Sequence, residues 1–402
     1  MPRALEKAIG GEKVWSVEEI IPRRADAIII GAGVVGTSIA YHLAARGLTN
    51  VVVLERNRIA QGASGDGAGG FRQQFSTTIN VRMTQLSLPY FLDAPARLGA
   101  AIELRQQGYL FLLTTAEQVI EFRTNLAMQQ GLRAPVRWLD PAEIATIVPG
   151  LRTDDLLGAT YCPDDGWARP PLLATAFARR AEELGARVFE GCPVTGILTN
   201  RGAVTGVTTQ HGAINAPIVI DAAGPWAAEV AASAGITLPA EPVCRQVFRT
   251  APFTGVAANA PLAIDVASGL WFRPHEGGFW WGKSDDAEPP GLVKHLDPDW
   301  ARHTVELARD RVPAFGAARV VGGWSGFYTM TPDAHGLIGG FPQLRGFYCA
   351  TGFSGHGFQH SPATGLLLAE IILDGRATTL DIHPLRPTRF AEGEPIVERY
   401  VV

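Results

Sequence analysis

The sequence has few cysteines and no dense block of one charge. The four thiols lie far apart in 402 residues and form no CxxC pair, so we expect neither a disulfide framework nor a metal site. The net charge is −4, and Lys and Arg do not cluster in any run. The chain therefore lacks the positive surface that binding to nucleic acid or to an anionic membrane requires.

Membrane-spanning and secretory patterns are also missing. Residues 1–24 lack the apolar core and cleavage site of a secretory signal, and we interpret them as an N-terminal extension of a cytoplasmic protein. Residues 27–45 carry no charge and approach the ~20 apolar residues that span a bilayer. Three glycines at turn spacing and the polar pair Tyr41 and His42 instead favour a strand, a turn and a helix there.

A hydrophobic content of 47% with 18% charged residues supports a large buried core. The pattern opens as strand, helix, strand over 26–30, 34–46 and 51–55, and it closes with a strand at 346–350 and a helix at 362–374. Between them, alternating residues at 268–284 indicate antiparallel strands. We therefore predict an α/β fold, in which a Rossmann-like dinucleotide-binding domain is interrupted by a mostly antiparallel substrate domain. The expected division assigns 25–98, 150–240 and 320–402 to the first domain and 99–149 and 241–319 to the second.

Several local elements are expected within this frame. The glycine-rich stretch 61–70 is predicted to be an irregular loop, and 78–98 one long helix. Another helix should begin after Asp140, which can cap it, with Pro141 in its first turn. Residues 214–220 read as one strand.

A dinucleotide motif lies between the first strand and the first helix. Gly31, Gly33 and Gly36 form GxGxxG with Val34 and Val35 inside it. These glycines permit the tight turn, the approach of backbone to a pyrophosphate, and close packing of helix on sheet. Glu55 ends the next strand, where an acid accepts hydrogen bonds from the adenosine ribose and repels a ribose phosphate.

Two later glycine motifs favour FAD over NAD. Residues 221–226 (DAAGPW) follow an apolar strand and offer a second backbone approach to the cofactor. Residues 350–358 (ATGFSGHGF) precede the last helix. A glycine-lined helix N-terminus there can stabilise negative charge at the pyrimidine end of a reduced flavin.

These motifs resemble the D-amino-acid oxidase superfamily of FAD-dependent oxidoreductases. The segments that carry the likeness are GAGVVG with Glu55-Arg56, GYLFLL, DDGWARP, AAGPWA, GFYTMTPDAHGLIG and ATGFSGHGF, and they extend over about 25–374. The branch is similar to sarcosine oxidase, its β-subunit-like relatives and the β subunits of proline dehydrogenase. The resemblance implies the FAD-binding fold of the glutathione-reductase type, with the flavin between the two domains.

The resemblance also assigns residues to the cofactor. It implies that 68–72 pass the flavin ring, that Pro193 and Val194 contact the adenine, and that 355–359 face the pyrimidine edge. Together with the motifs above, the expected FAD-binding set is Gly31, Gly33, Val34, Val35, Gly36, Glu55, Arg56, Ser64, Gly69, Gly70, Phe71, Arg72, Val194, Ala223, Gly224, Trp226, Gly352, Gly355, His356, Gly357, Phe358 and Gln359.

Four departures from monomeric sarcosine oxidase bear on the chemistry. Gly326 replaces the cysteine that links the flavin, and Asp66-Gly67 occupies the loop where dimethylglycine-type relatives carry a linking histidine, so we expect noncovalent FAD. Trp280 replaces the oxygen-activating lysine, which favours a dehydrogenase; Lys283 lies at an odd offset and would face the other side of a strand. Gln359 replaces the lysine that helps to bind the substrate carboxylate in monomeric sarcosine oxidase, whereas the partner arginine of that site is retained as Arg72.

The expected catalytic residues are Arg72, Tyr328, His356 and Gln359, and the first three each have a second interpretation. The planar guanidinium of Arg72 suits a carboxylate but equally a flavin contact or a salt bridge. Tyr328 is an active-site or a core tyrosine. His356 orients substrate or flavin, or else fixes its own loop. His360 is a further candidate to reach substrate. Tryptophans 271, 280, 281 and 324 form a cation-binding pocket or an ordinary core.

These residues predict hydride transfer to FAD from the carbon beside the nitrogen of a small amino acid or amine, followed by imine hydrolysis. The alternatives are oxidation of a 2-hydroxy acid, with His356 as the base, and an FAD-holding subunit of a larger amine dehydrogenase. A homo-oligomer, a partner subunit or a separate electron acceptor remain open as partners.

Overall fold

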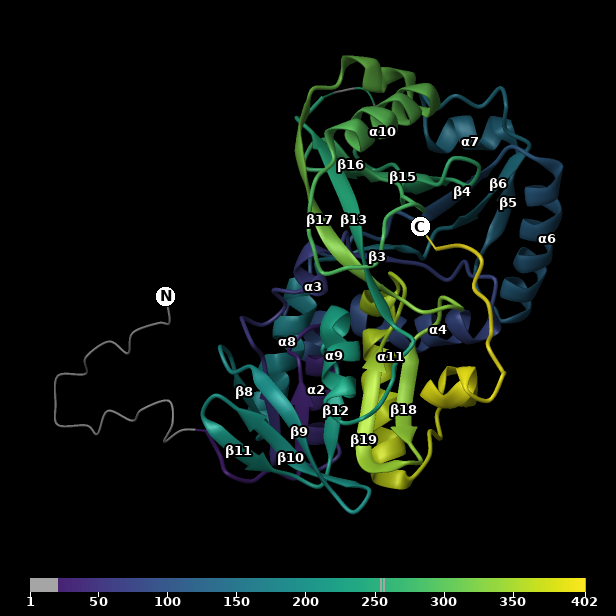
Figure 1. The fold of residues 1–402 in the computed structure, drawn as a ribbon. Coiled ribbons are helices and arrows are strands. Elements are labelled where there is room, and N and C mark those ends of the chain that lie inside the picture. The colour runs from purple at the N-terminus through teal and green to yellow at the C-terminus, as the bar shows by residue number, and fades with distance from the viewer. Residues whose placement is uncertain (1–20, 254, 256, 402) are drawn as a thin grey trace.

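The computed structural model describes residues 21–253, 255 and 257–401. Most of the expected N-terminal extension, residues 1–20, lies outside this part of the chain. The described residues fold into two sheets, one above the other in Figure 1, with helices packed against each. The expected α/β fold with a mostly antiparallel second sheet is confirmed.

The lower sheet has nine strands in the order β11-β10-β19-β12-β1-β2-β8, with β18 beside β19 and β9 beside β10. Strands β8, β2, β1, β12 and β19 run parallel. The central strands β1 and β2 consist almost entirely of Val and Ile and are buried on both faces, as parallel strands usually are. The bounds are β1 Ala27–Ile30, β2 Val51–Leu54, β8 Arg187–Phe189, β9 Val194–Asn200, β10 Ala203–Thr209, β11 Gly212–Asn215, β12 Val219–Asp221, β18 Leu337–Phe341 and β19 Leu344–Thr351.

Alternation along these strands divides the lower core into two layers. Ile28 and Ile30 pack under α9 (Ala227–Ala232) and β9 to β11, while Ala27 and Ile29 pack against α2 (Val34–Ala45) and α11 (Gly357–Asp374). Helix α2 also contacts α8 (Pro170–Glu183), and α11 contacts α4 (Thr78–Leu92). Gly365 allows α11 to approach α2, since a Cβ there would lie 2.3 Å from Oγ of Ser38.

The upper sheet has eight strands in the order β17-β13-β16-β15-β14-β4-β6-β5, all antiparallel except the β14–β4 pair. Helices α7 (Pro141–Ile147) and α10 (Pro298–Arg311) cover one face, and α6 (Ala116–Gly131) packs near the other. The bounds are β4 Tyr109–Leu113, β5 Arg137–Leu139, β6 Gly158–Cys162, β13 Glu241–Thr250, β14 Leu262–Asp265, β15 Leu270–His275, β16 Gly278–Gly282 and β17 Val320–Met330.

Asp140 caps α7 as expected, because its side chain accepts from the N–H of Glu143 while Pro141 occupies the first turn. Sheet membership differs from the expected domain division at two places. Strands β6 and β17, assigned from sequence to the FAD-binding domain, lie in the upper sheet. The remaining division stays a prediction.

Four local predictions were wrong. The loop at 61–70 contains a one-turn helix, α3 (Ala63–Asp66), and β3 (Gly70–Phe71), which pairs with β7 (Gly166–Trp167). The stretch 78–98 is divided at Asp93 into α4 and α5 (Ala94–Leu98), because the ring of Pro95 clashes with the carbonyl four residues earlier in a continuous helix. Pro217, which has no N–H to donate, separates β11 from β12.

The last helix begins at Gly357, five residues earlier than expected, although Pro362 lies inside it. Proline removes the hydrogen bond to the carbonyl of Phe358, and the hydroxyl of Ser361 donates to that carbonyl instead at 2.8 Å. A local side-chain donor therefore lets the helix continue through the proline.

Candidate active site

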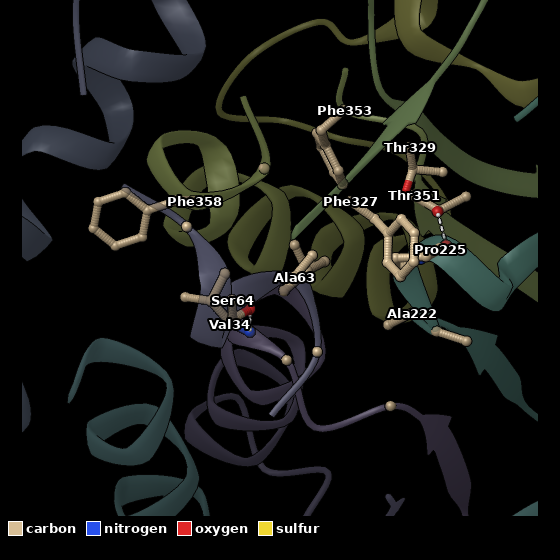
Figure 2. Close-up of a pocket in the computed structure, with 18 of the residues that line it drawn as sticks. Val34, Ala63, Ser64, Ala222, Pro225, Phe327, Thr329, Thr351, Phe353 and Phe358 are labelled. Carbon is tan, nitrogen blue, oxygen red and sulfur yellow. Dashed lines mark hydrogen bonds between the residues drawn. The ribbon is translucent and has the colours of Figure 1, made fainter. Parts of the chain in front are cut away.

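A cavity of about 530 Å³ is lined by residues of both sheets and reaches the N-terminus of α2. Figure 2 shows its walls: Val34 at the start of α2, Ser64 in α3, Ala222 after β12, Phe327 and Thr329 on β17, and Phe358 in α11. Segments distant in sequence thus meet around one space. Every residue of the expected FAD-binding set except Gly36 and Phe71 lines it.

The glycine turn at one end of the cavity is too tight for side chains. A Cβ on Gly31, whose φ is +104°, would lie 2.6 Å from the carbonyl oxygen of Ala222. One on Gly36 would lie 2.0 Å from the carbonyl oxygen of Gly31. The N–H of Val34 donates to the hydroxyl of Ser64 at 3.0 Å (Figure 2). The backbone and N-terminus of α2 therefore border the cavity, which is where a pyrophosphate binds in such motifs.

Glu55 follows β2 and lines the cavity. Its two carboxylate oxygens accept from the N–H groups of Ala32 at 2.9 Å and Asn57 at 2.8 Å. The acid is therefore fixed beside the glycine turn. Next to it, the guanidinium of Arg56 lies 3.8 Å from the ring centroid of Trp226, and both line the cavity. This stacked pair gives the cavity a flat wall next to Glu55.

The other end is built around the start of α11. Gly355 has φ of +91°, and a Cβ on it would lie 2.5 Å from Cε2 of Tyr328. The hydroxyl of Thr351 donates to the carbonyl of Gly224 at 3.2 Å, which joins the second and third glycine motifs (Figure 2). Both motifs thus line the same part of the cavity, as the sequence predicts for a shared cofactor.

Arg72 lies at this end and is 3% exposed. Its Nη1 donates to the carbonyl of Gln74, and its Nη2 contacts the carbonyl of Tyr400 at 2.5 Å and Nε2 of His356 at 3.3 Å. The main-chain N–H of Arg72 donates to Oε1 of Gln359 at 2.6 Å. Three of the expected catalytic residues are therefore in direct contact.

The guanidinium of Arg72 has no carboxylate of the described residues within 4.0 Å. Burial lowers its pKa, and the more distant charge of Glu398 is the largest influence in the opposite direction. A buried cation whose close partners are uncharged is costly unless an anion joins it. An anionic ligand bound beside Arg72 would therefore be stabilised by pairing with the guanidinium.

His356 is neutral in this environment. Burial, with a smaller effect from the adjacent Arg72, holds its pKa well below the usual value. Because an arginine only donates, Nε2 accepts and the proton lies on Nδ1. Burial also raises the pKa of Tyr328, so its hydroxyl stays protonated and can donate. Arg72, Tyr328, His356 and Gln359 all line the cavity.

Other candidates lie elsewhere. Nε2 of His360 contacts the hydroxyl of Thr84 at 3.2 Å, and this histidine does not line the cavity, because one residue further along α11 its side chain faces α4. Of the four tryptophans only Trp271 lines it. Trp281 is fully buried in the upper core, as the simpler interpretation expects, and Trp280 packs on Trp324 with centroids 4.6 Å apart.

Sequence reasoning missed Tyr109 and the segment near Tyr400. Tyr109 lines the cavity, and its hydroxyl oxygen would lie 1.8 Å from a Cβ on Gly70. The motif GYLFLL contained it, but the motif alone indicated only a strand. Nothing in the sequence placed Tyr400 beside Arg72, because that contact joins residues 328 positions apart.

The family model described as "DAO: FAD dependent oxidoreductase" matches residues 26–371. The chain belongs to this family. FAD-dependent oxidoreductase domain-containing protein 1 of Xenopus laevis is 34% identical, over 96% of this chain and 86% of that protein. Mitochondrial sarcosine dehydrogenase of Homo sapiens is 31% identical over 92% of this chain but only 42% of its own length. The structure of L-proline dehydrogenase from P. horikoshii superposes with a TM-score of 0.88 at 33% identity, covering 93% of this chain and all of that one.

These findings confirm the resemblance and its cofactor, FAD. The site fits that group: a glycine cradle that any Cβ would fill borders one end of the cavity, and the N-terminus of α11 borders the other. Among the described residues, no helix combines the length and apolar character that crossing a membrane requires. The cytoplasmic location stays a prediction.

Proposed function

We propose that this oxidoreductase acts on a small amino acid or an N-methyl or secondary amine that carries a carboxylate. The observation that carries the proposal is Arg72, a buried guanidinium at the cavity wall whose close partners among the described residues are all uncharged. A substrate carboxylate supplies the missing anion through charge-assisted hydrogen bonds. The names of two relatives, a sarcosine dehydrogenase and an L-proline dehydrogenase, support the same class of substrate.

The remaining residues orient the substrate and exclude water. The protonated hydroxyl of Tyr328 can donate to a second carboxylate oxygen, and neutral His356 steadies Arg72. Leu262, Ile264 and Trp271 give this end of the cavity an apolar wall, which disfavours the ammonium form of the amine. When bound, FAD would supply the hydride acceptor for oxidation of the carbon beside the nitrogen, and water would hydrolyse the resulting imine.

We infer that FAD is held without a covalent bond. The two positions at which relatives carry a linking residue meet in space, because a Cβ on Gly326 would lie 2.6 Å from Cβ of Asp66. Neither glycine nor a carboxylate paired with Lys294 supplies the nucleophile of such a link. The cofactor contacts expected for the whole FAD-binding set belong to this proposal, including those of Ser64, Val194, Ala223, Gly224 and Trp226.

A dehydrogenase is favoured over an oxidase. The position expected for an oxygen-activating lysine holds Trp280, whose ring packs on that of His275 with centroids 3.8 Å apart and the planes tilted by 35°. The ammonium of Lys283 donates to the carbonyl of Ser284, and this lysine does not line the cavity. The alternative reaction, oxidation of a 2-hydroxy acid, needs a base, but Nε2 of His356 already accepts from Arg72 and its pKa is well below the usual value.

Anaerobic bleaching of the flavin tests the proposal on the holoenzyme. We expect sarcosine, dimethylglycine or a cyclic or D-amino acid to bleach it, while lactate does not. Bleached enzyme should reoxidise faster with an artificial electron acceptor than with air. Bleaching by hydroxy acids alone would contradict the amine proposal, and failure of every compound would favour a role as an FAD-holding subunit.

Arg72→Lys tests the carboxylate site. Lysine keeps the charge but loses the planar fork, so the concentration for half-maximal bleaching should rise about tenfold or more. The methyl ester of the same substrate should bleach wild type and variant alike. Arg46→Lys, in a half-exposed ion pair with Asp374, is the matched control and should change nothing.

A further inference from the structure

A second element reaches the proposed carboxylate site from outside the cavity. The segment 396–401, named here the strap, rises along the side of the molecule and ends near β4 and the upper sheet (Figure 1). Its first part is held at Asp333, which accepts from the N–H groups of Ile396 at 3.1 Å and Glu398 at 3.0 Å. The strap therefore joins the lower domain to the upper one beside Arg72.

Glu398 anchors the middle of the strap and is 4% exposed. Its Oε1 accepts from the N–H of Ser76 at 3.0 Å and its hydroxyl at 2.7 Å. Its Oε2 accepts from the hydroxyl of Thr77 at 3.0 Å and Nδ2 of Asn80 at 3.2 Å. No guanidinium or ammonium of the described residues lies within 4.0 Å of this carboxylate.

The end of the strap carries the contact with Arg72. The ring of Tyr400 packs on Phe122 of α6 with centroids 4.6 Å apart, and its main-chain carbonyl accepts from Nη2 of Arg72. Tyr400 does not line the cavity, whereas Arg72 does. Arg72 therefore lies between the strap on one side and the substrate space on the other.

The geometry of a guanidinium decides what a carboxylate must displace. Two parallel N–H groups that can clamp a carboxylate are either Nη1 with Nη2 or Nε with Nη2, so both pairs include Nη2. The two protons of Nη2 are already directed to the carbonyl of Tyr400 and to Nε2 of His356. A bidentate clamp therefore requires one of these two partners to leave.

We propose that the strap is the partner that leaves, so that binding of a carboxylate substrate releases the Tyr400 end of the strap from Arg72. His356 is fixed at the N-cap of α11 and packs edge-on against Phe75 with centroids 5.0 Å apart. The strap has no helix or strand hydrogen bonding of its own. A neutral carbonyl is also a weaker partner for an arginine than a carboxylate.

This inference rests on the proposed role of Arg72 and adds a coupling to it. The strap competes with substrate for Nη2, and it keeps the buried guanidinium satisfied while substrate is absent. Tyr400 is accordingly a positioning residue, because it acts on the ligand only through Arg72. Weakening the strap should tighten carboxylate binding, whereas loss of an ordinary structural contact should weaken it.

Hydrogen exchange on the wild-type holoenzyme tests the release directly. Benzoate serves as the carboxylate probe and benzamide, of the same shape without charge, as its control. We expect benzoate to increase amide exchange in peptides that cover 396–401 and to leave peptides of α10 unchanged, while benzamide changes neither. Benzoate that leaves strap exchange unaltered or slows it would overturn the inference.

A binding measurement provides the second readout. In Tyr400→Ala the ring no longer packs on Phe122, so the Kd for benzoate, followed by the change in flavin absorbance, should fall about threefold or more. Tyr348→Ala removes a half-buried tyrosine of β19 that does not line the cavity and should leave the Kd unchanged. An unchanged or higher Kd in Tyr400→Ala would also contradict the inference.

The failures of the two proposals are distinguishable. If Arg72→Lys binds benzoate as tightly as wild type, the carboxylate role of Arg72 is wrong and the strap has no ligand to respond to. If benzoate binding depends on Arg72 but neither strap exchange nor the Tyr400→Ala Kd changes as expected, only the strap inference fails.

Discussion

At the scale of single residues, the glycines at the start of α2 are explained by atoms that occupy the place of a side chain. The carbonyl oxygens of Ala222 and Gly31 fill the space beside Gly31 and Gly36. Both obstacles are backbone atoms, which cannot rotate away as the end of a flexible side chain can. Both positions therefore require glycine, because the backbone at Ala222 approaches Gly31 and the backbone at Gly31 approaches Gly36.

Gly36→Ala should damage both folding and cofactor binding. Its new Cβ would overlap the carbonyl oxygen of Gly31, so the turn must open, and we expect a destabilisation of about 2 kcal/mol or more with loss of bound FAD. The measurements are urea unfolding and the ratio of flavin to protein absorbance. Gly131→Ala, where no atom lies within 4 Å of the new Cβ, should be neutral. Full FAD occupancy in Gly36→Ala would contradict the assignment.

At the scale of elements, the 3-10 turn Pro387–Phe390 is fastened to the loop before β18 by one buried ion pair. Arg389 is fully buried, and its Nε and Nη2 reach the two oxygens of Asp333 at 2.8 Å each. The pairing lowers the pKa of Asp333, although burial alone would raise it. The same carboxylate accepts from the N–H of Ile396, so this pair also fixes the start of the strap.

Asp333→Ala should therefore cost about 3–5 kcal/mol of unfolding free energy, because it leaves the guanidinium of Arg389 buried without an anion. Chemical denaturation checks this value. Asp374→Ala removes the half-exposed pair with Arg46 and should cost less than about 1 kcal/mol. Similar losses in the two variants would show that the buried pair is not the dominant fastening.

At the scale of the whole molecule, the cavity receives residues from both sheets. Gly33 and Glu55 belong to the lower domain, whereas Tyr109, Leu262 and Tyr328 come from strands of the upper sheet. A ligand bound here contacts both units at once. Cofactor binding is thus linked to the stability of the assembled pair of domains rather than to one of them.

Removal of FAD should lower the Tm by several degrees. A ligand at a thousand times its Kd contributes about 4 kcal/mol to the folded state, and that contribution is absent from the apoprotein. Differential scanning calorimetry of holoprotein, apoprotein and reconstituted protein measures the shift. If the apoprotein without FAD had the same Tm as the holoprotein at saturating FAD, binding in this cavity would be contradicted.

Local chemistry explains which predictions the sequence could support. The glycine turn at 31–36 and the cap at Asp140 act over a few residues, so their patterns were sufficient. The errors also have local causes that needed spatial information to recognise. Pro362 is tolerated because the hydroxyl of Ser361 satisfies the carbonyl of Phe358, and a proline pattern alone indicates only a helix boundary.

The sequence by itself determined the dinucleotide turn, the α/β class, the family and therefore FAD, because each depends on short-range geometry or on motifs read in order. Only the tertiary structure decided what surrounds Arg72. Its partners at Tyr400, His356 and Gln359 are 328, 284 and 287 positions away. That no carboxylate of residues 21–253, 255 and 257–401 lies within 4.0 Å of its guanidinium is visible only in the folded chain. The sequence shows that residue 72 is an arginine but not whether its side chain is buried or what it contacts. Both depend on the packed fold, and both are needed to infer a site for an anion.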